Sequence, residues 1–327
     1  MRAIKWNLNI DKLKICYNQP TELWQDLEKY NTNDFVNYDC FSLQIIDDGR
    51  GKEINDKPRT KIKARVLLDE GIELGSFTFN NSNKYCGKCF FEFTNKSFYT
   101  IAGYNFGKKY NHLISLDYVE QQLNLTKNNI TCIEIACDVN FNVIHIIQQL
   151  IKNYKDYTLY INGNIMDDET RKIENYGEYF QRSRKKRERY PTIYLSQKKE
   201  DSPSIKIYDK LTEINEESGK NYITEWNEMP TQMYRLEITC KNEDFKKFMQ
   251  LIGESNDNYN YIEGVCLHLS CEEYIHNLWK YICDRMLYFK HKETDEIITL
   301  SDICMQGYKP QKTKTSKVYN QHPFQIS

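Results

Sequence analysis

Hydrophobic and polar residues alternate with a period of two along many short segments of this chain. In its first third, such segments lie at residues 13–17, 41–46, 61–68, 74–79 and 89–93. This alternation is typical of strands that bury one face of an antiparallel sheet. Residues 23–30 instead carry apolar side chains at helical spacing. The pattern therefore predicts a series of antiparallel strands with a short amphipathic helix after the first one.

The middle of the chain repeats this arrangement of strands and helices. Alternating segments predict strands at residues 130–138, 158–161, 192–196, 205–210 and 233–240, and helical spacing predicts a helix at 143–154. A further helix is expected to begin at Asn242, a good N-cap, and to run to residue 252. The predicted fold class is α+β, with antiparallel sheets and packed helices. Two strand-rich halves, each with a long helix, would suit a duplicated sheet-plus-helix unit.

The pattern changes near residue 255. Residues 253–259 are polar and rich in turn formers, and residues 261–290 show a largely helical apolar spacing with a break at Ser270. We therefore predict one domain over residues 1–255, a helical region over 256–308, and a basic tail over 309–327 that is disordered without a partner.

The composition of the chain restricts its expected compartment and the charge of its partners. The longest apolar run is short and interrupted, so no segment is expected to cross a membrane. Eleven cysteines at irregular spacings, without a charged and apolar leader, indicate a reducing compartment, and we expect the cytoplasm. The net charge of -1 gives no sign of a polyanionic partner for the chain as a whole.

Positive charge is nevertheless concentrated between residues 180 and 210. The basic residues that we expect to contact DNA are Arg182, Arg184, Lys185, Lys186, Arg187, Arg189 and Lys206. Such a run grips a phosphate backbone when it lies beside a nucleic-acid site. The alternative is that it forms a solvated loop.

One strand of this region carries chemistry as well as charge. Lys206, Tyr208 and Lys210 are two residues apart and share one face of the predicted strand at 205–210. A tyrosine between two lysines suits attack on a phosphodiester, because the lysines attract the phosphate and favour the phenolate. Lys210 is the first candidate for stabilising charge on the phosphate, and Lys206 and Arg235 are weaker ones.

Three carboxylates on neighbouring strands, Glu134, Asp138 and Glu237, are candidates to hold Mg²⁺ or Mn²⁺. Glu134 and Asp138 are about 13 Å apart on an extended strand, too far for both to ligate one ion. Glu134 and Glu237 are therefore the preferred pair. Two simpler interpretations stay open: Asp138 begins a turn before the next helix, and Glu237 forms a cross-strand ion pair.

Three segments in this order resemble the signatures of the Rep_trans family. They are residues 133–138, the hairpin from 192–196 into 205–210, and residues 234–237. The family contains rolling-circle plasmid replication initiators and related relaxases of conjugative elements. The chain departs from the family pattern at Cys132, where the family has Arg, at Glu134, where it has Asp, and at Ser196, where it has Gly.

The resemblance implies a metal-dependent nickase. Tyr208 would attack one DNA strand at an origin, form a 5′-phosphotyrosine link and leave a free 3′-OH. Glu237, Glu134 and Asp138 match acidic positions of the signatures. Residues 1–255 would then be the nicking domain, and residues 256–308 would recognise the origin or hold a dimer.

The resemblance also implies partners: a single-stranded or hairpin origin, a host helicase and polymerase, and a second subunit. Two alternatives remain. The chain is a relaxase that starts conjugative transfer, or it is a non-catalytic DNA-binding regulator of the same fold.

Overall fold

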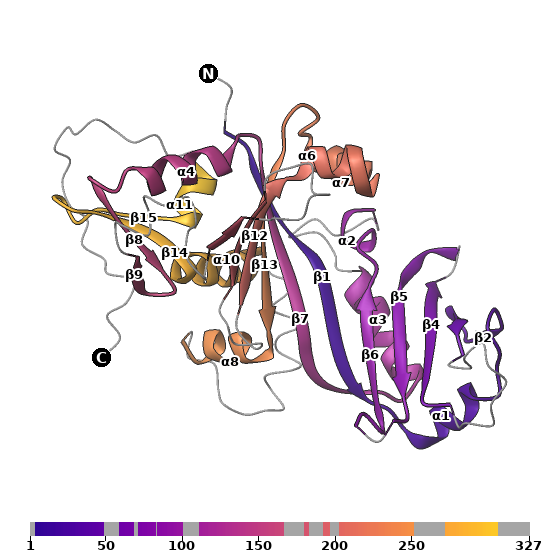
Figure 1. Ribbon diagram of the computed structural model, residues 1–327. Coiled ribbons are helices and arrows are strands. Elements are labelled where there is room, and N and C mark those ends of the chain that lie inside the picture. Colours follow the sequence, from indigo (N-terminus) through magenta and orange to yellow (C-terminus); the bar gives the residue numbers. More distant parts are fainter. Residues whose placement is uncertain are drawn as a thin grey trace.

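The computed structural model shows an α+β fold, which confirms the predicted fold class (Figure 1). The structure describes residues 4–48, 59–68, 71–82, 84–100, 111–166, 180–182, 192–196, 203–251 and 272–306. Within these residues the strands form one large and one small sheet, and all the strand pairs are antiparallel.

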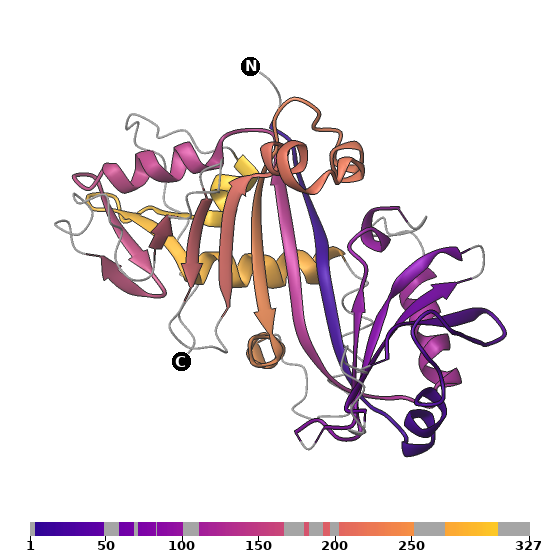
Figure 2. The ribbon, with the colours of Figure 1, turned by 45° about the vertical axis from the view of Figure 1, so that its right-hand side comes forward.

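The large sheet has eleven strands in the described part of the chain. In spatial order they are β10 (Phe180–Arg182), β11 (Thr192–Ser196), β12 (Ser204–Asp209), β13 (Tyr234–Lys241), β7 (Thr126–Val139), β1 (Trp6–Asn18), β6 (Lys88–Phe93), β5 (Glu73–Asn80), β4 (Lys61–Leu68), β3 (Phe41–Asp47) and β2 (Phe35–Asn37). The long strands β1 and β7 are adjacent at the middle of the sheet (Figure 2). Sequence neighbours therefore gather on each side, β2 to β6 beyond β1 and β10 to β13 beyond β7.

The small sheet has the order β15 (Ile297–Thr299), β14 (Leu287–His291), β8 (Tyr157–Ile161) and β9 (Asn164–Met166). It joins strands from two distant parts of the chain, because β14 pairs with β8.

The helices lie at the ends and on the faces of these sheets (Figure 1). They are α1 (Thr21–Leu27), α2 (Ser97–Thr100), α3 (Asn111–Gln122), α4 (Val143–Lys152), α6 (Lys210–Glu213), α7 (Asn221–Asn227), α8 (Asn242–Leu251), α10 (Glu272–Met286) and α11 (Leu300–Gln306). A single π-helical turn, Ile214–Ser218, follows α6. None of the described helices is long and apolar enough to cross a membrane.

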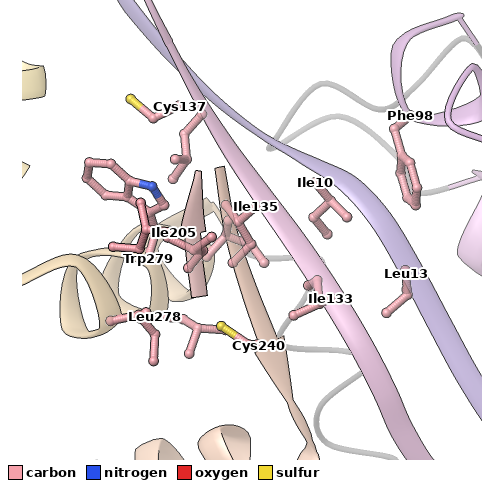
Figure 3. Packing of buried hydrophobic residues seen from close by; sticks show 14 of the residues in the cluster. Ile10, Leu13, Phe98, Ile133, Ile135, Cys137, Ile205, Cys240, Leu278 and Trp279 are labelled. Carbon is pink, nitrogen blue, oxygen red and sulfur yellow. The ribbon is translucent and has the colours of Figure 1, made fainter. Parts of the chain in front are cut away.

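One face of the large sheet is lined by buried apolar side chains from β11 across to β3. Buried side chains of β7, β12 and β13 pack there with α10, whose Trp279 lies beside Ile205 and whose Leu278 lies beside Cys240 (Figure 3). The strict alternation of these strands sends the intervening side chains to the opposite face. That second face, called the polar face below, carries the charged residues of β12, β13, β7, β1, β6 and β4.

All ten expected strands form, and the largest change is in β1, which begins at Trp6 rather than at residue 13. The segment 261–290, expected to be largely helical, is a helix only in part: α10 ends at Met286, and residues 287–291 form β14. In β14 the buried Leu287 and Phe289 alternate with partly exposed neighbours. A run of five residues is too short to distinguish the strand period of two from the helical period of 3.6. The expected boundary near residue 255 and the tail at 309–327 lie outside the described residues, and the predicted duplication stays a prediction.

Candidate active site

Tyr208 lies near the end of β12 on the polar face. Its hydroxyl donates a hydrogen bond to Oε2 of Glu237 on the neighbouring strand β13, at 3.2 Å. The register explains the contact, because Lys206 lies opposite Glu237 and Tyr208 lies opposite Arg235. The sheet therefore brings together the tyrosine and the carboxylate that the sequence singled out.

Two ammonium groups lie over the Tyr208 ring. Nζ of Lys206 is 4.2 Å from the ring centroid, and Nζ of Lys210 is 5.6 Å from it. Lys210 is the first residue of α6, and it also forms an ion pair with Glu213 at 2.6 Å. The strand stops here because the Asp209 side chain accepts a hydrogen bond from the backbone of Thr212 and caps α6. Together these cations cover a ring that is only 3% exposed.

The surroundings of Tyr208 do not favour its phenolate, contrary to the expectation from the two lysines. Burial, and then the negative charge of Glu237, raise the pKa of Tyr208 well above its ordinary value. Burial, and then the neighbouring Arg235, lower the pKa of Lys210. Tyr208 is therefore a neutral phenol at neutral pH, and Glu237 is the group placed to accept its proton.

Carboxylates crowd the polar face next to this tyrosine. Burial, and then Glu237, raise the pKa of Glu134 to about 7. Burial, and then Asp11, raise the pKa of Glu237. Each of these groups is partly enclosed and lies near another negative charge, so both ionise less readily than a solvated carboxyl group. A cation bound between them would remove that repulsion.

Arg235 is the centre of a buried network and is 0% exposed. Its Nε and Nη2 donate to the two carboxylate oxygens of Asp138 at 2.7 and 2.8 Å. It also forms an ion pair with Asp11, and its Nη2 donates to the Tyr99 hydroxyl at 3.1 Å. Arg235 is thus enclosed among protein groups and does not present its guanidinium to a substrate, as the sequence-based catalytic role would require.

The network also occupies Asp138. One of its oxygens accepts a second hydrogen bond, from Nδ2 of Asn227 at 2.7 Å, and the residue is 1% exposed. Asp138 lies inside β7, so it does not begin a turn. Its contacts suit the orientation of Arg235, and they do not suit the ligation of a metal ion.

Asp11 was not found by sequence reasoning. It lies at an irregularity of β1, where the register with β7 shifts between Ile10 and Lys12. Burial opposes its ionisation, but Arg235 and then Lys210 outweigh burial and lower the pKa of Asp11. A signal exists in the sequence, because Asp11 and Lys12 are two successive polar residues that break the alternation between Ile10 and Leu13.

Tyr99 and Asn227 complete the network from outside the sheet. The Tyr99 hydroxyl donates to Asp11 at 2.8 Å, from the short helix α2, and Asn227 ends α7. No periodic pattern points to residues in such short helices.

Most of the expected DNA-binding run lies outside the described residues. This holds for Arg184, Lys185, Lys186, Arg187 and Arg189, and Arg182 is described only as part of β10. Lys206 is placed at the site, over Tyr208.

In the described part of the chain, no three His, Cys, Asp or Glu side chains are arranged to hold one metal ion. Two carboxylates, Glu134 and Glu237, remain as donors on the polar face. Their chemistry fits Mg²⁺ or Mn²⁺, since Mg²⁺ is commonly held by one or two carboxylates together with water and substrate phosphates.

A scan against models of protein families finds no match to this chain, and a search of curated proteins finds no similar sequence. The resemblance to Rep_trans therefore rests on its three short motifs.

Proposed function

We propose that this chain is a metal-dependent DNA nickase that attacks one strand through Tyr208, as the initiators of rolling-circle replication do. The observation that carries the proposal is the hydrogen bond from the Tyr208 hydroxyl to Glu237, beneath two lysine ammonium groups. A nucleophile paired with a base, with cations beside both, is the arrangement that phosphoryl transfer to a side chain requires.

The chemistry follows from the positions of these groups. Oη of Tyr208 attacks the phosphorus of a phosphodiester and gives its proton to Glu237. The bond from phosphorus to the 3′-oxygen breaks, and that oxygen takes a proton from water. The products are a 5′-phosphotyrosine and a 3′-OH. Glu237 is placed to take this proton because its Oε2 already accepts the hydrogen bond from the Tyr208 hydroxyl.

Glu134 and Glu237 would hold the divalent cation. When bound, the cation neutralises the charge on the phosphate oxygens. Lys206 and Lys210 leave the face of the Tyr208 ring and contact the phosphate, which uncovers the hydroxyl. Arg235, held by Asp11 and Asp138, keeps β13 in place and holds positive charge below Glu237.

A non-catalytic DNA-binding regulator is the second candidate function. The observation that favours it is the burial of Tyr208, which is 3% exposed. The two functions differ in one property: only the nickase forms a covalent link to DNA.

The test uses a pool of random-sequence circular single-stranded DNA, so that no recognition sequence has to be assumed. The protein is incubated with the pool and Mn²⁺, denatured in SDS, and separated from free DNA. The nickase predicts DNA that stays attached and yields a common sequence next to the junction. EDTA, and separately Tyr208→Phe, should abolish the attachment, and Tyr288→Phe on the small sheet should not. Retention of specific DNA without attachment would support the regulator.

A further inference from the structure

The polar face continues from the candidate active site across the other half of the sheet. Glu134 of β7 lies opposite Lys12 of β1, and Lys14 lies opposite Glu92 of β6. The row goes on from Glu92 to Ser76 of β5 and to Arg65 of β4. Because cross-strand partners share a face, these side chains form one surface that begins beside Glu134.

Cations dominate this surface. The basic residues on its strands are Lys12 and Lys14 of β1, Lys88 of β6, and Lys61, Lys63 and Arg65 of β4. Two acids pair with them: Glu92 with Lys12 at 3.3 Å and with Lys14 at 3.8 Å, and Glu73 of β5 with Arg65 at 3.2 Å. The Lys12, Lys14 and Glu92 side chains are 36, 34 and 41% exposed, so the charges are open to solvent.

Aromatic rings lie among the cations. Phe90 of β6 is partly exposed, and Nζ of Lys14 is 5.4 Å from its ring centroid. Tyr85, which is 40% exposed, lies edge-on to Phe90 with a centroid distance of 5.8 Å. Exposed rings beside lysines are the combination on which unpaired bases stack while the phosphates are neutralised.

The helices of this half pack on the opposite face. Leu23, Trp24 and Leu27 of α1 join the apolar cluster. Tyr17 of β1 donates to Glu120 of α3 at 2.6 Å, which fixes α3 on the apolar side.

We propose that the polar face of β1, β6, β5 and β4 binds single-stranded DNA and leads it to Tyr208. That the bound strand reaches Tyr208 rests on the proposed function, but binding of the strand to this surface does not require cleavage. Lys14 and Arg65 are three strands apart, about 14 Å at ordinary strand spacing, so a bound strand spans several nucleotides between them. Paired bases cannot stack on Phe90, so the surface selects single strands over duplex.

The test is direct binding by the full-length protein in EDTA, so that no cleavage interferes. The probe is a fluorescently labelled, random-sequence single strand of about 20 nucleotides, which is longer than the roughly 4 to 16 nucleotides that such surfaces cover. Anisotropy is measured between about 50 and 200 mM salt, over which phosphate contacts lose affinity steeply. Lys14→Gln combined with Lys63→Gln should lower the slope of log K against log salt by about 1.4, or about 0.7 for each phosphate contact. Phe90→Ala should weaken binding about fivefold or more.

Two further variants separate this surface from general charge effects. Glu92→Gln removes the acid that holds Lys12 and Lys14, and it should tighten binding. Lys29→Gln removes one positive charge just after α1, where Lys29 pairs with Asp26 at 2.6 Å, and it should leave the slope unchanged. A duplex of the same length should bind more weakly than the single strand.

The proposal is overturned if Lys14→Gln with Lys63→Gln, and Phe90→Ala, bind like the wild type, or if duplex binds as well as single strand. These results are distinguishable from failure of the nickase. If single-stranded DNA binds through this face but no DNA becomes covalently attached, the nickase proposal is wrong and the binding surface stands. If DNA becomes attached and the Lys14, Lys63 and Phe90 variants bind it like the wild type, the binding surface is wrong and the nickase stands.

Discussion

Two tyrosines on opposite faces of the large sheet make the same hydrogen bond in different surroundings. Tyr17 of β1 donates to Glu120 under α3 at 2.6 Å, and Tyr208 of β12 donates to Glu237 at 3.2 Å. Both rings are buried, at 0 and 3% exposure. The side-chain chemistry is shared, so any difference in role comes from the neighbours.

The charged group that acts most strongly on the carboxylate differs between the two pairs. Burial raises the pKa of Glu120, but Lys127 opposes the shift, and its Nζ lies 2.9 Å from the carboxylate. Burial also raises the pKa of Glu237, and there the next contribution, from Asp11, increases the shift. Glu120 thus has a cation in direct contact with it, whereas Glu237 is influenced first by the carboxylate of Asp11 and only then by Arg235, Lys206 and Lys210.

The difference shows how a packing contact can be told from a candidate site. In the Tyr17 pair, Lys127 balances the charge of Glu120, and the hydrogen bond joins α3 to the sheet. The Tyr208 pair has charges of both signs around it, and the raised pKa of Glu237 indicates that its cations do not offset burial and Asp11 fully. A site that needs a cation or a phosphate to complete its charges is what the proposed nickase requires.

The largest expected effect separates the two tyrosines by function. Tyr208→Phe should reduce covalent attachment to DNA to the level seen in EDTA, because phenylalanine lacks the hydroxyl that attacks phosphorus and donates to Glu237 on β13. Tyr17→Phe should keep the attachment. Gel separation in SDS after incubation with single-stranded DNA and Mn²⁺ measures both. Attachment in Tyr208→Phe would remove the distinction.

Arg235→Met should produce the largest loss of stability. It leaves Asp11 and Asp138 without their partner, and loss of one member of a buried ion pair costs about 3 to 5 kcal/mol. Urea unfolding measures the free energy. Lys246→Met, which breaks the exposed pair with Glu243 at 3.1 Å, should cost less than about 1 kcal/mol. Similar costs for the two would contradict the role of Arg235 as the centre of the network.

Glu134 should make stability depend on pH. Its pKa rises from 4.5 to about 7 on folding, so between these values the folded chain binds more protons than the unfolded chain. The contribution is therefore a stabilisation at acid pH that is lost as pH rises through this window, worth at most roughly 3 kcal/mol. Glu134→Gln should flatten the profile relative to the wild type, and the exposed Glu225→Gln should not. An unchanged profile in Glu134→Gln would contradict the electrostatic account.

The smallest expected effect compares the two hydrogen bonds by stability. Tyr17→Phe leaves a buried Glu120 oxygen without its donor and should cost about 1 to 2 kcal/mol. Tyr208→Phe should cost less, because Glu237 is partly exposed and the bond is longer. Thermal or urea unfolding of both variants gives the values. A greater loss in Tyr208→Phe would show that its bond, too, is mainly structural.

The sequence predicts much of the sheet and part of the site. Alternation places Tyr208, Glu237 and Glu134 on adjacent strands and one face, because the period of a strand fixes which side chains meet. It does not reveal that Arg235 and Asp138 bind each other, since an arginine and a carboxylate have the same pattern whether they are paired or face a substrate. The role of Asp11 depends on a register shift between β1 and β7, and residue propensities do not predict at which residue such a shift occurs.

The most direct measurement of the central claim is the identity of the residue joined to DNA. After incubation with single-stranded DNA and Mn²⁺, the denatured protein is digested with nuclease and trypsin and analysed by mass spectrometry. Trypsin cleaves after Lys206 and Lys210, so Tyr208 is recovered in the peptide of residues 207–210. The account predicts this peptide with a nucleotide linked to its tyrosine. A nucleotide linked to any other residue, or to none, would contradict it.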